Sequence, residues 1–322
     1  MNKIKRIALV GGSGFIGSHL APELTQRGYS TRILTRRRER NRALLVLPTC
    51  DIVQTDVHDP DALRTALDGC DAVISLAGIL NEGSRNSESF ESVHVDLPRK
   101  VAAACVDLGI KRLLHMSALN ASPEGPSLYL STKHAGETAA MAASEHGVAV
   151  TSFRPSVIFG PGDSFILRFA QLLRMVPGVM PLACADAKMQ PVYVRDVVQA
   201  FSDAVEDEST HGQIYDLAGP KVYTLRELVE YTATVCDLDR DVWALPDGIA
   251  RLQASIMGMI PGKPFSMDNY RSLQVDSILS GENGLSAFGI EPTPMDTVVP
   301  NYLGTANREG RNSRFRQEAT RR

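Results

Sequence analysis

The first half of the chain alternates short apolar runs with longer stretches in which apolar residues recur at helical spacing. The apolar runs are Arg6–Val10, Thr31–Thr35, Asp51–Gln54, Ala72–Leu76, Arg112–Met116 and Ala149–Arg154. Short apolar runs bounded by turn residues predict buried strands, and the periodic stretches between them predict helices. The regular alternation predicts an α/β fold, a doubly wound parallel sheet of the Rossmann type.

The helices expected between these strands are Ser18–Gln26, Asp59–Leu67, Glu88–Leu108 and Tyr129–Glu145. Asp59 is suited to cap its helix, with Pro60 at the first helical position. The second half is less regular, and its expected elements are the helices Phe165–Met175, Asp196–Val205 and Leu225–Cys236 and a strand at Ile214–Leu217. Asp196 is expected to cap the second of these helices.

Three glycines with the spacing G-x-x-G-x-x-G follow the first strand: Gly11, Gly14 and Gly17. A strand, a tight glycine turn and a helix in this order are a fingerprint of dinucleotide binding. Gly11 permits the sharp turn, Gly14 lets the backbone approach a pyrophosphate, and Gly17 lets the helix pack on the strand. The helix N-terminus then offers free N–H groups to the phosphates.

The end of the second strand indicates which dinucleotide is bound. An acidic residue there typically binds the ribose of NAD, whereas a basic one accommodates the 2′-phosphate of NADP. Here the strand ends in Thr35 followed by Arg36, Arg37 and Arg38. A guanidinium suits a phosphate in charge and geometry, so we expect NADP(H) rather than NAD(H), with Arg36 as the discriminating residue. The alternative is a solvated basic helix start.

Two other strand ends bear on the same site. Asp56 follows the third strand and is placed to accept a hydrogen bond from the adenine amino group, or to cap the turn before His58. Ala77 and Gly78 follow the fourth strand, where small side chains let the backbone lie against a cofactor.

A Y-x-x-x-K pattern, Tyr129 and Lys133, lies on a predicted helix with both side chains on one face. A lysine near a phenol lowers the tyrosine pKa, which fits the phenol for proton exchange with a hydroxyl or carbonyl. Ser117 follows the fifth strand, on the sheet edge where doubly wound folds bind ligands, and its hydroxyl can polarise the same carbonyl.

The division into domains follows from the break at Gly160-Pro161-Gly162. We predict that residues 1–160, with 190–218, form an NAD(P)-binding Rossmann domain. Residues 161–189 and 219–304 are expected to form a smaller carboxyl-side substrate lobe, and 305–322 a basic tail. That tail carries six arginines and two glutamates. It is either disordered or an electrostatic anchor for anionic lipid or an acidic partner.

Composition excludes several classes of protein. A hydrophobic content of 43% with 22% charged residues is typical of globular proteins, and a net charge of −3 gives no attraction to nucleic acid. No apolar stretch is long enough to predict a transmembrane segment. The five cysteines are dispersed, so neither a disulfide framework nor a metal site is expected. The first strand begins almost at once, so we expect no signal peptide and a cytoplasmic location.

With these motifs in place, the chain resembles the extended short-chain dehydrogenase/reductases, the NAD-dependent epimerase/dehydratase group. Its segments 75–80, 117–121, 153–162 and 191–194 are similar to the branch of the complex I accessory NAD(P)H-binding subunit and its bacterial relatives. Many extended members carry an asparagine where this chain has His94, which we expect to be packed rather than catalytic.

The resemblance implies a catalytic set and a cofactor site. The catalytic set is Ser117, Tyr129 and Lys133. The cofactor site comprises Gly11, Ser13, Gly14, Phe15, Ile16, Gly17, Arg36, Asp56, Ala77, Gly78, Lys133, Pro155, Ser156 and Val157. In the respiratory branch the bound NADPH is thought to be structural. The resemblance therefore implies respiratory-complex association, peripheral on the inner membrane, as an alternative to a purely cytoplasmic enzyme.

Three functions remain open. The first is an oxidoreductase that transfers a hydride between NADP(H) and a carbonyl or secondary alcohol, with Tyr129 as acid/base. The second is an accessory or assembly protein of a respiratory NADH:quinone oxidoreductase complex that holds nucleotide without turning it over. The third is a nucleotide-sugar epimerase or dehydratase, which the lack of an acid after the second strand disfavours, since those enzymes usually use NAD. The sequence does not identify the small-molecule substrate.

Overall fold

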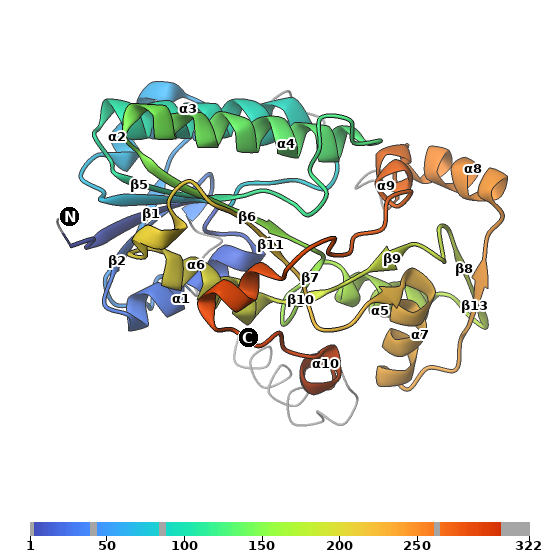
Figure 1. Cartoon of the computed structure of the whole chain (residues 1–322). Coiled ribbons are helices and arrows are strands. Elements are labelled where there is room, and N and C mark those ends of the chain that lie inside the picture. Colours follow the sequence, from blue (N-terminus) through green and yellow to red (C-terminus); the bar gives the residue numbers. More distant parts are fainter. Residues whose placement is uncertain (1–2, 39–43, 84–87, 261–264, 304–322) are drawn as a thin grey trace, which may run out of the picture.

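A parallel sheet of seven strands forms the centre of the molecule (Figure 1). The structure, a computed structural model, describes residues 3–38, 44–83, 88–260 and 265–303. In spatial order the strands are β11 (Ile214–Leu217), β6 (Ala149–Pro155), β5 (Arg112–Met116), β4 (Ala72–Ser75), β1 (Arg6–Val10), β2 (Ser30–Thr35) and β3 (Cys50–Gln54). The predicted doubly wound fold is confirmed. The strand order reverses between β1 and β4, the place where such sheets bind ligands at their carboxyl ends.

Helices cover both faces of the sheet (Figure 1). One face carries α2 (Pro60–Leu67), α3 (Leu97–Asp107) and α4 (Leu128–Met141), and the other α1 (Phe15–Gln26) and α6 (Val194–Ala204). Side chains alternate along β1: Ile7 and Leu9 join the core under α1 and α6, whereas Ala8 and Val10 join the core under α2 and α3. All four are fully buried, as a strand covered on both faces requires.

A third core lies beyond the carboxyl edge of the sheet. It is built by α5 (Ile166–Met175), β8 (Val179–Leu182), α7 (Leu225–Val235), β13 (Asp241–Ala244) and α10 (Met295–Leu303). Smaller pairs, β7 (Ile158–Phe159) with β10 (Val192–Tyr193) and β9 (Lys188–Met189) with β12 (Tyr223–Thr224), connect it to the sheet. The helices α8 (Asp247–Met257) and α9 (Met267–Ser272) pack together, and α9 also contacts α4 (Figure 1).

The structure confirms one of two predicted helix caps and contradicts the other. The Asp59 cap of α2 is confirmed, since its carboxylate accepts hydrogen bonds from the N–H groups of Asp61 and Ala62. The Asp196 cap is wrong, because α6 begins at Val194. Asp196 lies inside its first turn, where its carboxylate accepts hydrogen bonds from the backbone and hydroxyl of Thr293 at 2.7 and 2.8 Å. Asp196 thus ties α6 to the chain that leads to α10.

The long helix expected at Glu88–Leu108 is irregular in its first part. Glu91–Asp96 forms a π-helical turn, and α3 continues from Leu97. Such turns widen the helix and are frequent at functional sites. None of the helices within the described ranges is long and apolar enough to cross a bilayer. The basic tail, Thr305–Arg322, lies outside the described residues.

Candidate functional site

The glycine turn that follows β1 has the close packing that its motif predicts. Gly11 has a φ of +78°, and a Cβ atom added there would lie 2.9 Å from the backbone nitrogen of Ala77. A Cβ on Gly17 would lie 2.3 Å from the carbonyl oxygen of Gly12, so this glycine lets α1 pack against the turn. A larger residue at position 11 would push the turn away from the end of β4. A larger residue at position 17 would push α1 away from the turn.

The N-terminus of α1 faces a cavity of about 860 Å³. Gly14 caps the helix without a side-chain hydrogen bond, and its first turn has no acidic residue. The terminus therefore keeps its partial positive charge and is suited to an anion such as a pyrophosphate. The predicted residues that line this cavity are Gly11, Ser13, Gly14, Phe15, Ile16, Gly17, Arg36, Ala77 and Gly78.

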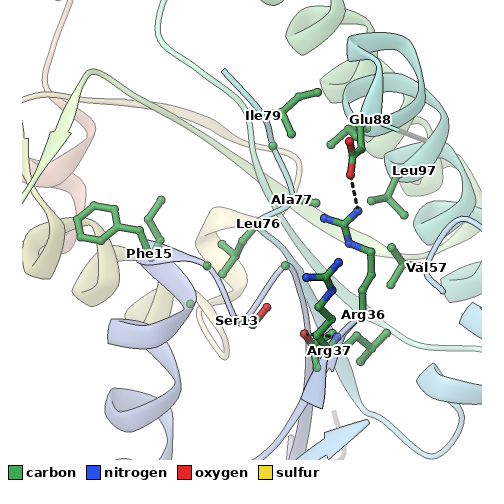
Figure 2. Close-up of a pocket in the computed structure, with 18 of the residues that line it drawn as sticks. Ser13, Phe15, Arg36, Arg37, Val57, Leu76, Ala77, Ile79, Glu88 and Leu97 are labelled. Carbon is green, nitrogen blue, oxygen red and sulfur yellow. Dashed lines mark hydrogen bonds and ion pairs between the residues drawn. The ribbon is translucent and has the colours of Figure 1, made fainter. Parts of the chain in front are cut away.

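Two arginines extend into the same cavity from the end of β2 (Figure 2). Arg36 forms an ion pair with Glu88 at 3.2 Å, and the two side chains are 61% and 29% exposed. Arg37 lies beside it in the cavity wall (Figure 2). The two guanidinium groups supply positive charge where a 2′-phosphate is expected.

A second cavity, of about 370 Å³, shares part of its lining with the first. Phe15, Ile16 and Gly78 line both cavities. The remaining predicted residues in the second cavity are Ser117, Tyr129, Lys133, Pro155, Ser156 and Val157. The structure thus brings the predicted catalytic set together beside the predicted cofactor site.

Tyr129 and Lys133 lie one turn apart on α4. The Lys133 ammonium donates a hydrogen bond to the carbonyl of Met116 at 2.7 Å, and burial lowers the pKa of Lys133 to about 8. Burial also raises the pKa of Tyr129 to about 12. The prediction of a lowered tyrosine pKa is therefore wrong in this structure, because burial disfavours the charged phenolate. The Tyr129 hydroxyl keeps its proton at neutral pH.

Ser117 supplies a buried hydroxyl to the second cavity. Its side chain is 3% exposed, and within the described residues its Oγ atom has no hydrogen-bond partner. A buried hydroxyl without a partner is costly unless a ligand or water completes it. Because the Ser117 side chain also lines the second cavity, a ligand oxygen is a suitable partner.

His94 is packed, as predicted, behind Tyr129. Its Nε2 atom accepts a hydrogen bond from the N–H of Ile79 at 3.0 Å, which assigns the ring proton to Nδ1, 3.1 Å from the hydroxyl of Thr132. The ring lies edge-on to Tyr129, with centroids 5.4 Å apart, and burial lowers the pKa of His94 to about 3. His94 therefore acts as a neutral link between the segment after β4 and α4.

Asp56 differs from the other predicted cofactor residues. Its carboxylate accepts a hydrogen bond from the backbone N–H of His58 at 3.0 Å, and it is not among the described residues that line either cavity. The turn-capping alternative is confirmed, and a contact of Asp56 to adenine stays a prediction. The neighbouring residues Val57 and His58 line the cavity instead.

Several lining residues were not predicted as part of the site. They include His58, Glu88, Leu97 and Ser164. These residues come from loops and helices whose approach depends on tertiary structure. Arg37 also lines the cavity and belongs to the run of arginines from which NADP(H) was expected. Within the described ranges, no cluster of three or more His, Cys, Asp or Glu residues is arranged to hold a metal ion.

Comparison with known proteins identifies relatives of this chain. The model of the NAD dependent epimerase/dehydratase family matches residues 7–218. The chain is 28% identical over 294 residues to the mouse mitochondrial NADH dehydrogenase [ubiquinone] 1 alpha subcomplex subunit 9, covering 89% of this chain and 76% of that protein. It is 33% identical over 190 residues to ceramide reductase of Caulobacter vibrioides, covering 59% and 57%.

Solved structures share the fold. The dTDP-glucose 4,6-dehydratase of Streptomyces venezuelae, solved with NAD bound, superposes with a TM-score of 0.73 at 20% sequence identity. The superposition covers 92% of this chain and 95% of that one. At this level of identity the likeness extends to the fold alone.

Proposed function

Because the chain belongs to the NAD-dependent epimerase/dehydratase family, we propose that it binds NADP(H) and catalyses hydride transfer between this cofactor and a carbonyl or secondary alcohol. The observation that carries the proposal is that Ser117, Tyr129 and Lys133 line a cavity adjoining the one at the N-terminus of α1. Residues from β1, β5 and α4 thus converge on one place.

The cofactor fits the residues present. The uncapped N-terminus of α1 suits the pyrophosphate, and Gly11 keeps the turn close to β4. Arg36 and Arg37 would hold the 2′-phosphate, and the ammonium of Lys133 would hold the nicotinamide ribose. Pro155, Ser156 and Val157 would meet the nicotinamide in the second cavity. When bound, NADP(H) supplies or accepts the hydride.

In the direction of reduction, the protein groups have separate roles. Ser117 would orient the substrate oxygen through its unpartnered hydroxyl. Tyr129 would donate its phenolic proton to that oxygen, for which a pKa of about 12 keeps the proton in place. Lys133, below its pKa of about 8, would stabilise the phenolate left behind. We assign residues 161–189 and 219–304 to the lobe that binds the rest of the substrate.

The test is nucleotide binding followed by turnover. The purified full-length protein is titrated with NADPH and NADH, and NADPH oxidation is then followed with a panel of ketones. We expect NADPH to bind more tightly and Tyr129→Phe to lose roughly a hundredfold or more in rate while NADPH affinity is retained. Equal rates for Tyr129→Phe and the unaltered protein would refute the catalytic role. Tighter binding of NADH would refute the cofactor preference.

A second candidate is an accessory protein that holds nucleotide without turning it over. The similarity to the mouse NADH dehydrogenase subunit over 89% of this chain favours it. In that case the chain would bind peripherally to a respiratory complex of the inner membrane, with the basic tail as one contact. The expected result is tightly bound NADPH that no ketone oxidises, and co-sedimentation with membranes that is lost on deletion of residues 305–322.

A further inference from the structure

We infer that the second cavity takes a carbonyl compound with a long aliphatic chain, rather than a nucleotide sugar. The inference rests on the proposed function, because it places the reacting oxygen at Ser117 and Tyr129. The chain would then lie along the apolar lining that leads from these residues to the surface. Three observations carry this assignment: the charge of the cavity lining, its apolar side chains and the exposure of its rim.

The lining holds almost no charge. Its charged residues within the described ranges are Lys133 and Lys188, with no arginine and no carboxylate. Lys133 is 5% exposed and already donates to the Met116 carbonyl, so its ammonium is held at the catalytic end. A nucleoside diphosphate brings two charged phosphates, which proteins usually bind with arginine forks or several cations. A single further lysine does not meet that requirement.

Most of the exposed lining is apolar, and five side chains outside the predicted site residues contribute to it: Leu119, Leu130, Phe165, Met189 and Leu273. These side chains come from the loop after β5, from α4, from the residue before α5, and from β9 and the turn after α9. A sugar placed there would find hydroxyl and amide partners such as Ser272, Ser277 and Asn120, but the diphosphate of a nucleotide sugar would lose its hydration without matching positive charge, which is costly. An alkyl chain would gain burial without that penalty.

The apolar lining continues to the molecular surface. Leu80 and Val275 line the cavity and are 57% and 38% exposed, so they form an apolar rim. Hydrogen bonds hold the backbone at or beside both positions. The side chain of Asn269 donates to the carbonyl of Leu80 at 3.2 Å. The side chain of Asn120 donates at 2.7 Å to the carbonyl of Asp276, the residue after Val275. A chain leaving the cavity between Leu80 and Val275 would cover both side chains.

The test is the affinity of a homologous series for the NADPH-loaded full-length protein. Pentan-2-ol, heptan-2-ol and nonan-2-ol are titrated by calorimetry. With reduced cofactor these alcohols form dead-end complexes, so the measurement needs no turnover. We expect Kd to fall by roughly threefold for each added methylene, as burial of the chain requires. A Kd independent of chain length, or UDP-glucose binding more tightly than nonan-2-ol, would overturn the inference.

A matched pair of variants locates the chain. Val275→Asn places an amide on the rim, and Val222→Asn makes the same change at a 41% exposed valine that does not line the cavity. Val275→Asn should weaken nonan-2-ol by roughly tenfold and leave pentan-2-ol nearly unchanged, because only the longer chain reaches the rim. Val222→Asn should change neither. Equal effects of the two variants on nonan-2-ol would refute this path for the chain.

The two proposals fail in different ways. If affinity rises with chain length but nonan-2-one never oxidises NADPH, hydride transfer is refuted and the aliphatic ligand class stands. If short ketones oxidise NADPH but affinity does not depend on chain length, hydride transfer stands and the aliphatic inference is refuted.

Discussion

The backbone N–H of Tyr129 donates a hydrogen bond at 3.2 Å to the carboxylate of Asp268, a residue 139 positions later in the chain. The other carboxylate oxygen accepts from Leu128 at 2.7 Å. Asp268 belongs to α9, whereas Tyr129 lies in the first turn of α4. A carboxylate from α9 therefore binds free N–H groups at the start of the helix that carries the candidate acid/base.

The first prediction concerns this contact. Asp268→Ala should lower the free energy of unfolding by about 1 kcal/mol, the usual effect of losing a helix cap. It should also lower kcat of NADPH-dependent reduction more than it changes the NADPH affinity, because the Tyr129 hydroxyl loses its fixed position. Urea denaturation and steady-state rates measure the two effects. Asp186→Ala, which removes an exposed carboxylate from the same lobe, is the control. If both variants behave alike, Asp268 does not position α4.

The second prediction concerns Arg36. Arg36→Ala should weaken NADPH by roughly tenfold to a hundredfold while changing NADH little, because it removes a charge-assisted contact to the 2′-phosphate. Arg99→Ala is a close control: that side chain is also 61% exposed and also pairs with one carboxylate, that of Asp96, but it does not line the cavity. Fluorescence titration with both nucleotides measures the effect. An equal loss of NADH affinity would contradict the phosphate contact.

The third prediction uses the carboxylate opposite Arg36. Glu88 holds the guanidinium at 3.2 Å and brings negative charge to the cavity wall. Glu88→Gln keeps the size of the side chain and removes its charge, so NADPH affinity should rise by several-fold, more at low salt than at high salt. The partly exposed ion pair itself contributes little to stability, so the free energy of unfolding should stay within about 0.5 kcal/mol. Weaker NADPH binding by Glu88→Gln would mean that Glu88 itself contacts the cofactor.

The fourth prediction concerns Gly136, where α4 approaches the π-helical turn most closely. A Cβ atom there would lie 1.7 Å from the carbonyl oxygen of His94, so Gly136→Ala must displace one of the two segments. We expect a loss of about 1–3 kcal/mol in the free energy of unfolding and a slower reduction, because His94 packs against Tyr129. Gly248→Ala, on α8 with open space around its Cβ position, should be neutral or stabilising. A neutral Gly136→Ala would show that the π-helical turn adapts freely.

The sequence predicted the features that depend on local patterns. The six strands of the first half and the glycine turn are where the apolar runs and the spacing of Gly11, Gly14 and Gly17 placed them. The Y-x-x-x-K pair lies on α4, and Ser117 follows β5. In each case a short segment determines its own geometry, so no distant contact was needed for the prediction.

Features that depend on distant contacts were not predictable. Glu88 meets Arg36 across 52 residues, and Asp196, inside the first turn of α6, binds Thr293, which lies 97 positions later. The raised pKa of Tyr129 has the same origin. The i, i+4 spacing predicted an ammonium near a phenol, but burial of the phenol raises its pKa instead. Desolvation is a property of the assembled fold, not of the motif.

The last prediction concerns pH. Burial lowers the pKa of Lys133 to about 8, whereas the unfolded chain has the ordinary value of 10.5. Between pH 8 and pH 10.5 Lys133 is protonated in the unfolded chain and mostly neutral in the folded chain, so the free energy of unfolding increases as pH rises. Below pH 8 Lys133 is protonated in both states, and burial of its ammonium lowers the free energy of unfolding by the full amount. The free energy of unfolding of Lys133→Met minus that of the unaltered protein should therefore be largest below pH 8 and decline up to pH 10.5. Urea denaturation across this range measures it, with Lys111→Met, at an exposed position, as the control for general alkaline effects. A difference that does not change with pH would show that Lys133 keeps its ordinary pKa and is solvated in the folded protein.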